Sequence, residues 1–417
     1  MEPAQTNPAP GNGSDRPDPG TTRMKLLAIE EELNKRFLER HEESRGLLCA
    51  LVARENVLLL GPPGTAKSAL AQALCARLQT DGGTGDAADG YFYTLLSRTS
   101  TPEQLFGPVS IKALENDSYA RKTAGYLPEA RMAFIDEIFK GNSAVLNGML
   151  SILNERIYVN DGCRIPVPLK LCIGASNELP ADREELDALW DRFMLRFQTS
   201  YLSDASFEAM LLGAEARAEA GTASADSPTS LFADELETAC AAASEVKTSH
   251  LVGSLGTIRR SLREGSITAS DRRYARGLSL VRANAFLDGR TEAAEEDLAI
   301  LQHSLWPDPS ARQEVRRKVM EVAAPQLGDA QDYLDQAREI HHNALSAPDG
   351  EKKSEAGFEA NGKLKHIHNK LSALAGMKDK AASGGARTTV QKRIEAIATE
   401  VGRMNEEVLD KCLGMST

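Results

Sequence analysis

The segment with the clearest chemical meaning is GPPGTAKS at residues 61–68, between a short apolar run and a run of strong helix formers. Backbone N–H groups of such a loop can surround a β-phosphate, its lysine can contact the β and γ phosphates, and its serine hydroxyl can bind Mg²⁺. A chance glycine-rich turn before a helix is the alternative. The predicted phosphate-binding residues are Gly61, Pro62, Pro63, Gly64, Thr65, Ala66, Lys67 and Ser68.

Ala66 departs from the general pattern, which has glycine at this position of the loop. We expect alanine to be tolerated because the position is entering the helix. Lys67 and Ser68 follow directly, as phosphate binding requires. We therefore keep the prediction of a nucleotide site.

Two further apolar runs end in polar side chains that suit phosphate chemistry. The predicted strand in MAFIDE ends in Asp136 and Glu137, and the predicted strand in KLCIGASNELP ends in Ser176 and Asn177. Open α/β sheets place their ligands at the carboxyl ends of strands, so these side chains should meet the phosphate loop. Asp136 would hold Mg²⁺, and Glu137 would act as the general base for an attacking water. Asn177 could orient that water, although a lone asparagine in a turn carries no weight by itself.

The apolar periodicity predicts several structural parts along the chain. Short apolar strands alternate with helical stretches up to about residue 212, which indicates a parallel α/β sheet. A polar stretch at 214–230 precedes a wholly helical region that ends at WPDP, and three amphipathic helical stretches follow. We predict a disordered tail at 1–23, an α/β core at 24–212, a helical lid at 213–309 and a helical arm at 310–417.

Composition narrows the classes of partner and compartment. The net charge is −11, so nucleic acid is a poor default partner. Neither a signal peptide nor a bilayer-spanning apolar run is evident, and the six cysteines lack CxxC pairing, which favours a reduced, cytoplasmic protein. His366 and His368 are too close in sequence to share a helix face, so we interpret them as surface residues rather than metal ligands.

Several segments together resemble the MoxR family of AAA+ ATPases, closest to its regulatory ATPase variant A (RavA) branch. The likeness runs continuously from Leu26 to Pro307. It implies a P-loop AAA+ core, with a parallel sheet sandwiched by helices, an α-helical lid, and ATP and Mg²⁺ as cofactors. The segments that carry it are GPPGTAKS, RTSTPEQLFGPVSI, AGYLPEARMAFIDEIFKGNSAVLNGMLSILNER, ASNELP, LWDRFMLRF and SDRRYARGLSLVRANAFLDGR.

The resemblance assigns further catalytic roles by position. Asn177 matches the first sensor of the family, and Arg192 in LWDRF matches the arginine finger given to the ATP of the neighbouring subunit. Arg272 in SDRR matches the second sensor on the lid. Arg196 and Arg273 are close rivals for the finger and the second sensor, respectively. From the residues alone, each arginine is more often a salt-bridged surface residue.

The resemblance also implies an insert within residues 107–129, a hairpin at 157–169, and assembly into a hexameric ring. Relatives act as chaperone-like remodellers or activators of protein complexes, often beside a von Willebrand factor A domain protein. In the RavA branch a β-rich domain interrupts the helical arm, whereas here only short loops separate the helices. The lysine decarboxylase partner of that branch is therefore in doubt for this chain.

Two other functions stay open at this stage. One is a nucleic-acid or chelatase-type motor, although Arg156 and Arg164 are the only basic residues between positions 154 and 168. The other is a nucleotide-switched scaffold with little turnover. An ATPase rate that depends on Glu137 would separate the scaffold from the motors.

Overall fold

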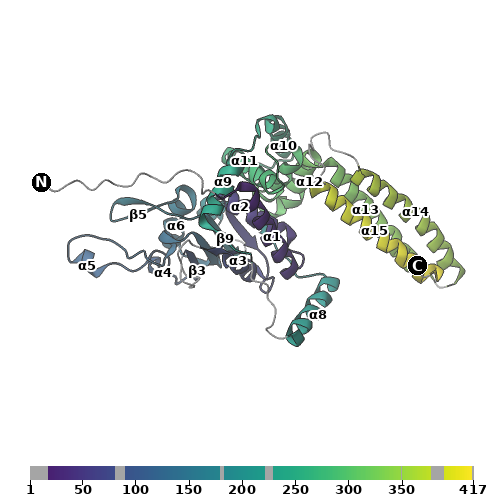
Figure 1. Ribbon diagram of the computed structural model, residues 1–417, viewed down its shortest axis with the longest axis horizontal. Helices are drawn as coiled ribbons and strands as arrows, with labels where there is room; N and C mark the ends of the chain where they lie inside the picture. The colour runs from purple at the N-terminus through teal and green to yellow at the C-terminus, as the bar shows by residue number, and fades with distance from the viewer. Residues whose placement is uncertain are drawn as a thin grey trace. The chain divides into compact units, whose positions relative to one another are not determined.

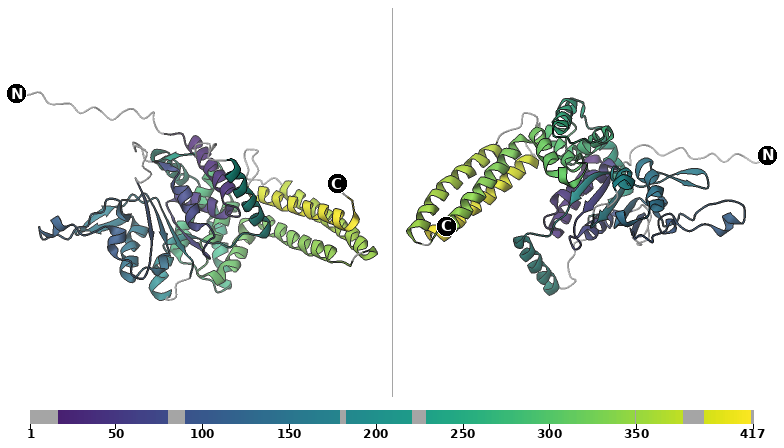
Figure 2. Two further views of the ribbon diagram at one scale, coloured as in Figure 1. Left: turned by 90° about the horizontal axis from the view of Figure 1, so that it is seen from below. Right: turned by 180° about the vertical axis from the view of Figure 1, so that it is seen from behind.

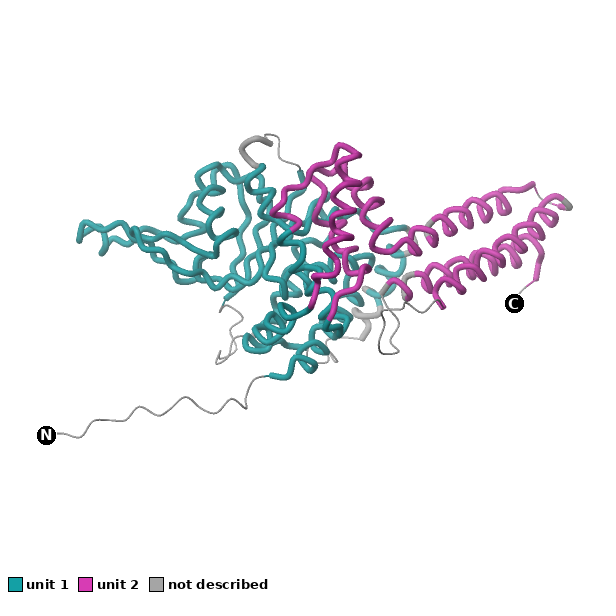
Figure 3. The backbone as a smooth tube through the Cα atoms, turned by 90° about the horizontal axis from the view of Figure 1, so that it is seen from above, with its two compact units in different colours: residues 1–246, 275–291 teal, residues 247–274, 292–417 magenta. Residues whose placement is uncertain are grey.

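The computed structural model describes residues 17–79, 90–178, 183–220, 229–348, 350–376 and 389–415. The chain divides into two compact units, residues 1–246 with 275–291 and residues 247–274 with 292–417 (Figure 3). Across these described ranges, no helix is both long enough and apolar enough to cross a membrane. The predicted boundaries at residues 212 and 309 stay predictions.

The first unit is built on a five-stranded sheet in the order β3-β4-β7-β1-β8, and every neighbouring pair is parallel. All residues of β1 and β7 are buried, as expected for strands covered on both faces. This confirms the predicted α/β fold. The strands are β1 Asn56–Leu60, β3 Tyr91–Leu95, β4 Met132–Asp136, β7 Leu171–Ser176 and β8 Phe193–Gln198.

Helices pack against this sheet and against one another (Figure 1). Helix α2 contacts β1 and β8, α3 contacts β4 and β7, and α1 packs on α2, α3 and α9. The helices of this unit are α1 Pro19–Arg36, α2 His41–Ala53, α3 Lys67–Cys75, α4 Pro102–Phe106, α5 Ile111–Leu114, α6 Ser143–Glu155, α7 Arg183–Trp190, α8 Asp204–Ala220 and α9 Ala233–Ser244, with 3₁₀ turns η1 Leu127–Glu129 and η2 Ile138–Lys140.

Two local features differ from the sequence predictions. Helix α1 begins at Pro19, inside the segment assigned to a disordered tail, because the Asp18 side chain accepts a hydrogen bond from the Thr21 N–H and caps the first turn. Residues 1–16 of that tail lie outside the described residues. The region expected to be wholly helical after 231 opens with a two-residue strand, β9 Leu231–Phe232, parallel to β2 Leu78–Gln79.

The predicted insert and hairpin are joined side by side. The hairpin comprises β5 Ile157–Asn160 and β6 Cys163–Pro166. Asp161, at the hairpin turn, accepts hydrogen bonds from the Ser118 hydroxyl and the Tyr119 N–H of the insert. Asn160 exchanges hydrogen bonds with both backbone groups of Arg121. The insert and hairpin therefore form one lobe.

The second unit is helical. Helix α12 packs against α10 and η4, and α13, α14 and α15 lie side by side as a bundle with an Ala- and Leu-rich core (Figures 1 and 2). At Gly357 of α14, an added Cβ would lie 2.6 Å from Cys412 Cβ, so glycine permits the close approach of α15. The elements are η3 Ser249–Leu251, α10 Val252–Glu264, α11 Asp271–Leu287, which begins here and continues into the first unit, η4 Glu295–His303, η5 Pro309–Ala311, α12 Arg312–Ala323, α13 Pro325–Leu345, α14 Glu351–Gly376 and α15 Thr389–Leu413.

Candidate active site

The phosphate loop connects β1 to α3 and is anchored at the carboxyl ends of β7 and β8. The Gly61 N–H donates to Ser176 O at 3.1 Å, and the Thr65 hydroxyl lies 2.9 Å from the Thr199 hydroxyl. Gly61 has φ +149°, and a Cβ there would meet Thr199 O at 2.3 Å. Glycine is thus required where the loop turns away from the sheet. These contacts fix the loop before any phosphate binds.

Ala66 takes the left-handed conformation, with φ 64° and ψ 20°, and is the N-cap residue of α3. We expected alanine to be tolerated because the position enters the helix; that reason is wrong, since Ala66 precedes the first helical residue and has a left-handed backbone. A residue with a Cβ is strained in this region by about 1–3 kcal/mol. The strain accompanies a turn that leaves the first N–H groups of α3 facing the loop, where an anion would bind.

Lys67 crosses the loop rather than pointing into solvent. Its ammonium donates to Gly61 O at 2.7 Å, Pro62 O at 2.9 Å and Asn177 Oδ1 at 2.7 Å. Burial lowers the pKa of Lys67, and the nearby carboxylates of Asp136 and Glu137 oppose that shift. A phosphate would offer this buried cation a stronger, charged acceptor than its present partners.

Ser68 and Asp136 meet as the sequence predicted, one from α3 and the other from β4. The Ser68 hydroxyl donates to Asp136 Oδ2 at 3.1 Å. Hydroxyl and carboxylate oxygens are the hard ligands that Mg²⁺ prefers. Across the described residues, no group of three or more His, Cys, Asp or Glu side chains could hold a metal by itself. The arrangement fits a Mg²⁺ ion held jointly by the protein and phosphate oxygens.

Glu137 and Asn177 also come together, from the ends of adjacent strands. The Asn177 amide donates to Glu137 Oε1, so Asn177 links Glu137 to Lys67. Glu137 Oε2 is buried without a hydrogen-bond partner and lies 3.4 Å from Lys140 Nζ. Glu137 itself has a left-handed backbone, φ 50°. Because Oε2 carries no hydrogen bond, it can accept one from a water molecule and then take its proton.

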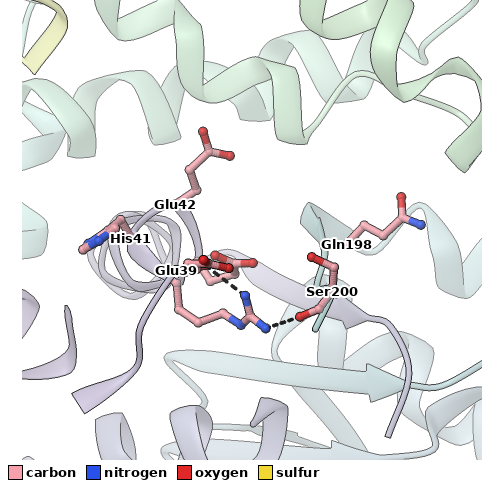
Figure 4. Close-up of a pocket in the computed structure, with 7 residues that line it drawn as sticks. Glu39, His41, Glu42, Gln198 and Ser200 are labelled. Carbon is pink, nitrogen blue, oxygen red and sulfur yellow. Dashed lines mark hydrogen bonds between the residues drawn. The ribbon is translucent and has the colours of Figure 1, made fainter. Parts of the chain in front are cut away.

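A pocket beside the loop contains a functional candidate that the sequence analysis missed. Its lining comes from the α1–α2 turn and the end of β8, namely Glu39, Arg40, His41, Glu42, Glu43, Gln198 and Ser200 (Figure 4). Arg40 is 5% exposed and donates to Thr65 O at 3.4 Å and to Ser200 O. An arginine between two predicted helices gives no local signal of this role.

The two candidate arginine fingers have different environments. Arg192 is partly exposed and precedes β8, whereas Arg196 lies within β8, fully buried, 4.9 Å from the Trp190 ring. Because Phe193 pairs with Asn56 at the start of β1, Arg192 lies at the amino edge of the sheet, opposite the phosphate loop. At about 3.3 Å per residue, β1 separates these edges by about 15 Å. The structure does not bring Arg192 to the phosphate loop of its own chain.

Arg272 and Arg273 open helix α11 in the second unit. Arg273 is 3% exposed and donates to Ser304 O at 2.7 Å, a packing role within that unit. Arg272 is half-buried. Since the phosphate loop belongs to the first unit, the second-sensor role of Arg272 stays a prediction.

Comparison with known proteins agrees with this architecture. A sequence profile of the MoxR domain in the MoxR-vWA-beta-propeller ternary systems matches residues 24–240, and a profile of an AAA lid domain matches residues 250–319. The parallel sheet, the phosphate loop and the lid define an AAA+ ATPase. Within that class, the chain belongs to the MoxR family.

Relatives extend the match over most of the chain. Two uncharacterised proteins of Methanocaldococcus jannaschii are similar: one is 40% identical over 285 residues, 68% of this chain and 70% of that protein. The other is 38% identical over 299 residues, 72% of this chain and 76% of that protein. A crystal structure of a predicted ATPase from Cytophaga hutchinsonii covers 73% of this chain and 94% of its own, with a TM-score of 0.56. At 17% identity, that likeness shows the fold alone.

Proposed function

We propose that this protein hydrolyses Mg²⁺-bound ATP to ADP and phosphate, and that it does so in a ring of identical subunits. The observation that carries the proposal is the convergence of Lys67, Asn177 and Glu137 in one hydrogen-bonded chain beside the Ser68–Asp136 pair. Each group in this chain suits one requirement of phosphoryl transfer to water.

The proposed reaction uses the protein groups as follows. Lys67 and the first N–H groups of α3 bind the β and γ phosphates. Glu137 Oε2 accepts a proton from water as the water oxygen bonds to the γ-phosphorus, and the bond from that phosphorus to the bridging oxygen breaks. Asn177 orients the water. When bound through Ser68 and Asp136, Mg²⁺ supplies positive charge to the phosphate oxygens.

We place the nucleoside part of ATP in the pocket that contains Arg40. Support comes from the hydrogen bond of Arg40 to Thr65 O, which joins one lining residue of the pocket to the phosphate loop. Binding of ATP but not of inorganic triphosphate at equal concentration, measured by calorimetry, is the expected result. Equal affinity for both would contradict this placement.

We propose that Arg192 is the arginine finger for the ATP of the next subunit, and that the subunits therefore assemble into a ring. Its place at the amino edge of the sheet supports this role, since it is too distant to act on its own ATP. The complete burial of Arg196 and the packing role of Arg273 make Arg192 and Arg272 the better candidates for the finger and second sensor. A hexamer is the expected form.

The client we propose is a protein complex, remodelled or activated in the cytoplasm with a von Willebrand factor A domain protein as partner. The matching MoxR profile is named for systems that contain such a domain, which supports the partner. A RavA-branch assignment remains part of the proposal. All six cysteines are free, as suits a reducing compartment.

A nucleic-acid motor has less support from the hairpin. Arg156 donates to backbone carbonyls and to Asn56, and Arg164 pairs with Glu155. The exposed large apolar side chains of this hairpin are Val159 and Ile165, beside the exposed Arg164. An apolar surface with its arginines already engaged suits contact with protein better than with phosphate backbones.

Affinity capture with Glu137→Gln in the presence of ATP tests the function as a whole. A ring stalled before hydrolysis should retain its client, and wild-type protein with ADP is the matched control. Capture of nucleic acid instead of protein would favour the motor. Wild-type protein with no Glu137-dependent phosphate release would favour the scaffold.

A further inference from the structure

The amino edge of the sheet holds a buried polar network around Asn56, the first residue of β1. Asn56 is completely buried, and its amide nitrogen donates to Leu153 O at 3.0 Å and to Arg192 O at 3.1 Å. Its amide oxygen accepts from Arg156 Nη2 at 3.0 Å. The asparagine amide thus uses both of its donors and its acceptor.

Arg156 extends this network to the base of the hairpin. It caps α6 in the left-handed conformation, φ 56°, and donates to Leu153 O and Arg54 O, each at 3.0 Å. Its own carbonyl accepts from the Val167 N–H at 2.8 Å, closing the segment that contains the hairpin. Arg156 therefore holds Asn56, the end of α6 and the hairpin base together.

Glu55, the residue before Asn56 in the chain, forms the other side of the network. Glu55 is 4% exposed and receives a two-pronged contact from Arg276 of α11, with Nε to Oε1 at 2.9 Å and Nη2 to Oε2 at 2.6 Å. Burial raises the pKa of Glu55, and the guanidinium of Arg276 opposes the shift. With its neighbour fixed by this pair, Asn56 has little freedom to move.

We infer that Asn56 is a positioning residue for Arg192, and that Arg156 holds the Asn56 amide in the orientation this role requires. The inference rests on the proposed role of Arg192 as a finger for the neighbouring subunit. The Asn56 amide donates a hydrogen bond to the carbonyl oxygen of Arg192, and the backbone N–H of Arg192 donates to Leu189 O at 3.0 Å. Both backbone groups of Arg192 are therefore fixed, which sets the point from which its side chain starts, and Nη1 of that side chain donates to Ala188 O of the same chain at 3.2 Å.

Preorganisation explains why a buried amide in one subunit matters for a reaction in the neighbouring subunit. An arginine that must meet a transferring phosphoryl group is effective only when its position is fixed in advance. Asn56 touches no substrate, so its effect on hydrolysis should act through Arg192, whereas the loss of its contacts with Leu153 and Arg156 should lower stability. ATP binding in the same chain should then be unaffected, since β1 separates Asn56 from the phosphate loop.

The decisive variant is Asn56→Asp, which keeps the size of the side chain and the acceptor for Arg156 but loses both donors. We expect kcat to fall roughly 10- to 100-fold, as for a small misplacement of a catalytic group, with the Kd for ATP unchanged. Asn160→Asp is the matched control, because it loses an amide donor to the Arg121 carbonyl far along the hairpin. That control should keep the wild-type rate.

Rings that contain two kinds of variant subunit show whether Asn56→Asp affects only the position of Arg192 or damages the subunit as a whole. Glu137→Gln subunits carry an intact Asn56 and Arg192, so equal mixtures with Asn56→Asp subunits should recover activity, as mixtures with Arg192→Ala should. If Arg192→Ala is rescued while Asn56→Asp is not, or if Asn56→Asp alone has wild-type kcat, the inference is overturned. If Arg192→Ala is not rescued, the finger proposal itself fails, and the inference with it.

If Asn56→Asp yields no folded protein, Arg156→Met tests the positioning role of Asn56 instead. This change leaves the Asn56 donors in place but removes the partner of its amide oxygen. A smaller fall in kcat with unchanged Kd for ATP and rescue by Glu137→Gln is the expected result. A fall that Glu137→Gln subunits do not rescue would contradict the role assigned to Asn56.

Discussion

The two ends of β1 both carry buried polar groups, but in opposite states. At the carboxyl end, Glu137 Oε2 is buried without a hydrogen-bond partner, and Lys67 is held by neutral acceptors only. At the amino end, both amide donors of Asn56 and its amide oxygen are hydrogen-bonded. The carboxylate that must engage a substrate is left with capacity to bind, whereas the amide that we propose positions another residue has a partner for each of its polar atoms.

The largest effect should come from removing the cation at the carboxyl end. Lys67→Ala takes away the only lysine ammonium that contacts the loop carbonyls among the described residues, so nucleotide binding should be abolished. Isothermal titration with ATP measures this. Lys35→Ala, which removes an exposed lysine on α1, is the control and should bind normally. Measurable ATP affinity in Lys67→Ala would contradict the assignment.

Removing the carboxylate should separate binding from turnover. Glu137→Gln keeps the shape and the contact with Asn177 but cannot accept a proton, so the rate should fall about 10²- to 10⁴-fold with ATP binding retained. Phosphate release and calorimetry on the same preparation measure both properties. A variant that turns over near the wild-type rate would remove Glu137 as the base.

At the amino end, Arg192→Ala should lower the rate about 10²- to 10³-fold, the scale of losing one charge-stabilising donor. Equal mixtures with Glu137→Gln subunits should recover activity. Arg196→Ala offers the contrast, because it empties a buried site against Trp190 and should lower the melting temperature instead. If activity recovers in mixtures that contain Arg196→Ala but not in mixtures that contain Arg192→Ala, Arg196 would be the finger and Arg192 the structural residue.

Removing helices of the arm should affect neither ATP binding at the carboxyl end of β1 nor the Arg192 site at its amino end. Its helices α13–α15 have a hydrophobic core of their own, so a chain ending at Ala324 should bind ATP and keep a substantial ATPase rate while losing its protein partner. Light scattering, an ATPase assay and a pull-down compare the truncated and full-length chains. A truncated protein that keeps its partner but becomes monomeric would show that the arm serves assembly.

The smallest effect on activity should come from Gly357→Ala in the arm. The added Cβ would lie 2.6 Å from Cys412 Cβ, so α14 and α15 must separate, at a cost of about 1–3 kcal/mol in the stability of the bundle. Calorimetric melting measures this cost, and the ATPase rate should be unchanged. Gly362→Ala, with open space around its Cβ, is the control.

Local sequence patterns were sufficient to predict which side chains meet at the carboxyl end of the sheet, but not to predict the hydrogen-bonded network at its amino end. GPPGTAKS and the acids after MAFI are contiguous runs, and parallel strands necessarily bring their ends together. Asn56 and Arg156 lie 100 positions apart and join through side-chain hydrogen bonds that leave no periodic trace. The left-handed conformation of Ala66 was missed because its side chain gives no indication of φ.

The junction between the insert and the hairpin has a mechanical consequence. Asp161 and Asn160 hold the insert through the Ser118 hydroxyl and through the main chain of Tyr119 and Arg121. The Phe106 and Tyr158 rings also stack, with their centroids 5.5 Å apart. A load applied to the tip of either segment is therefore shared by both, so the lobe should be stiff in bending and yield in a single step under force. Asp161→Ala would remove the contacts to Ser118 and Tyr119 but leave the two hydrogen bonds between Asn160 and Arg121, so the lobe should become less stiff without separating into two parts.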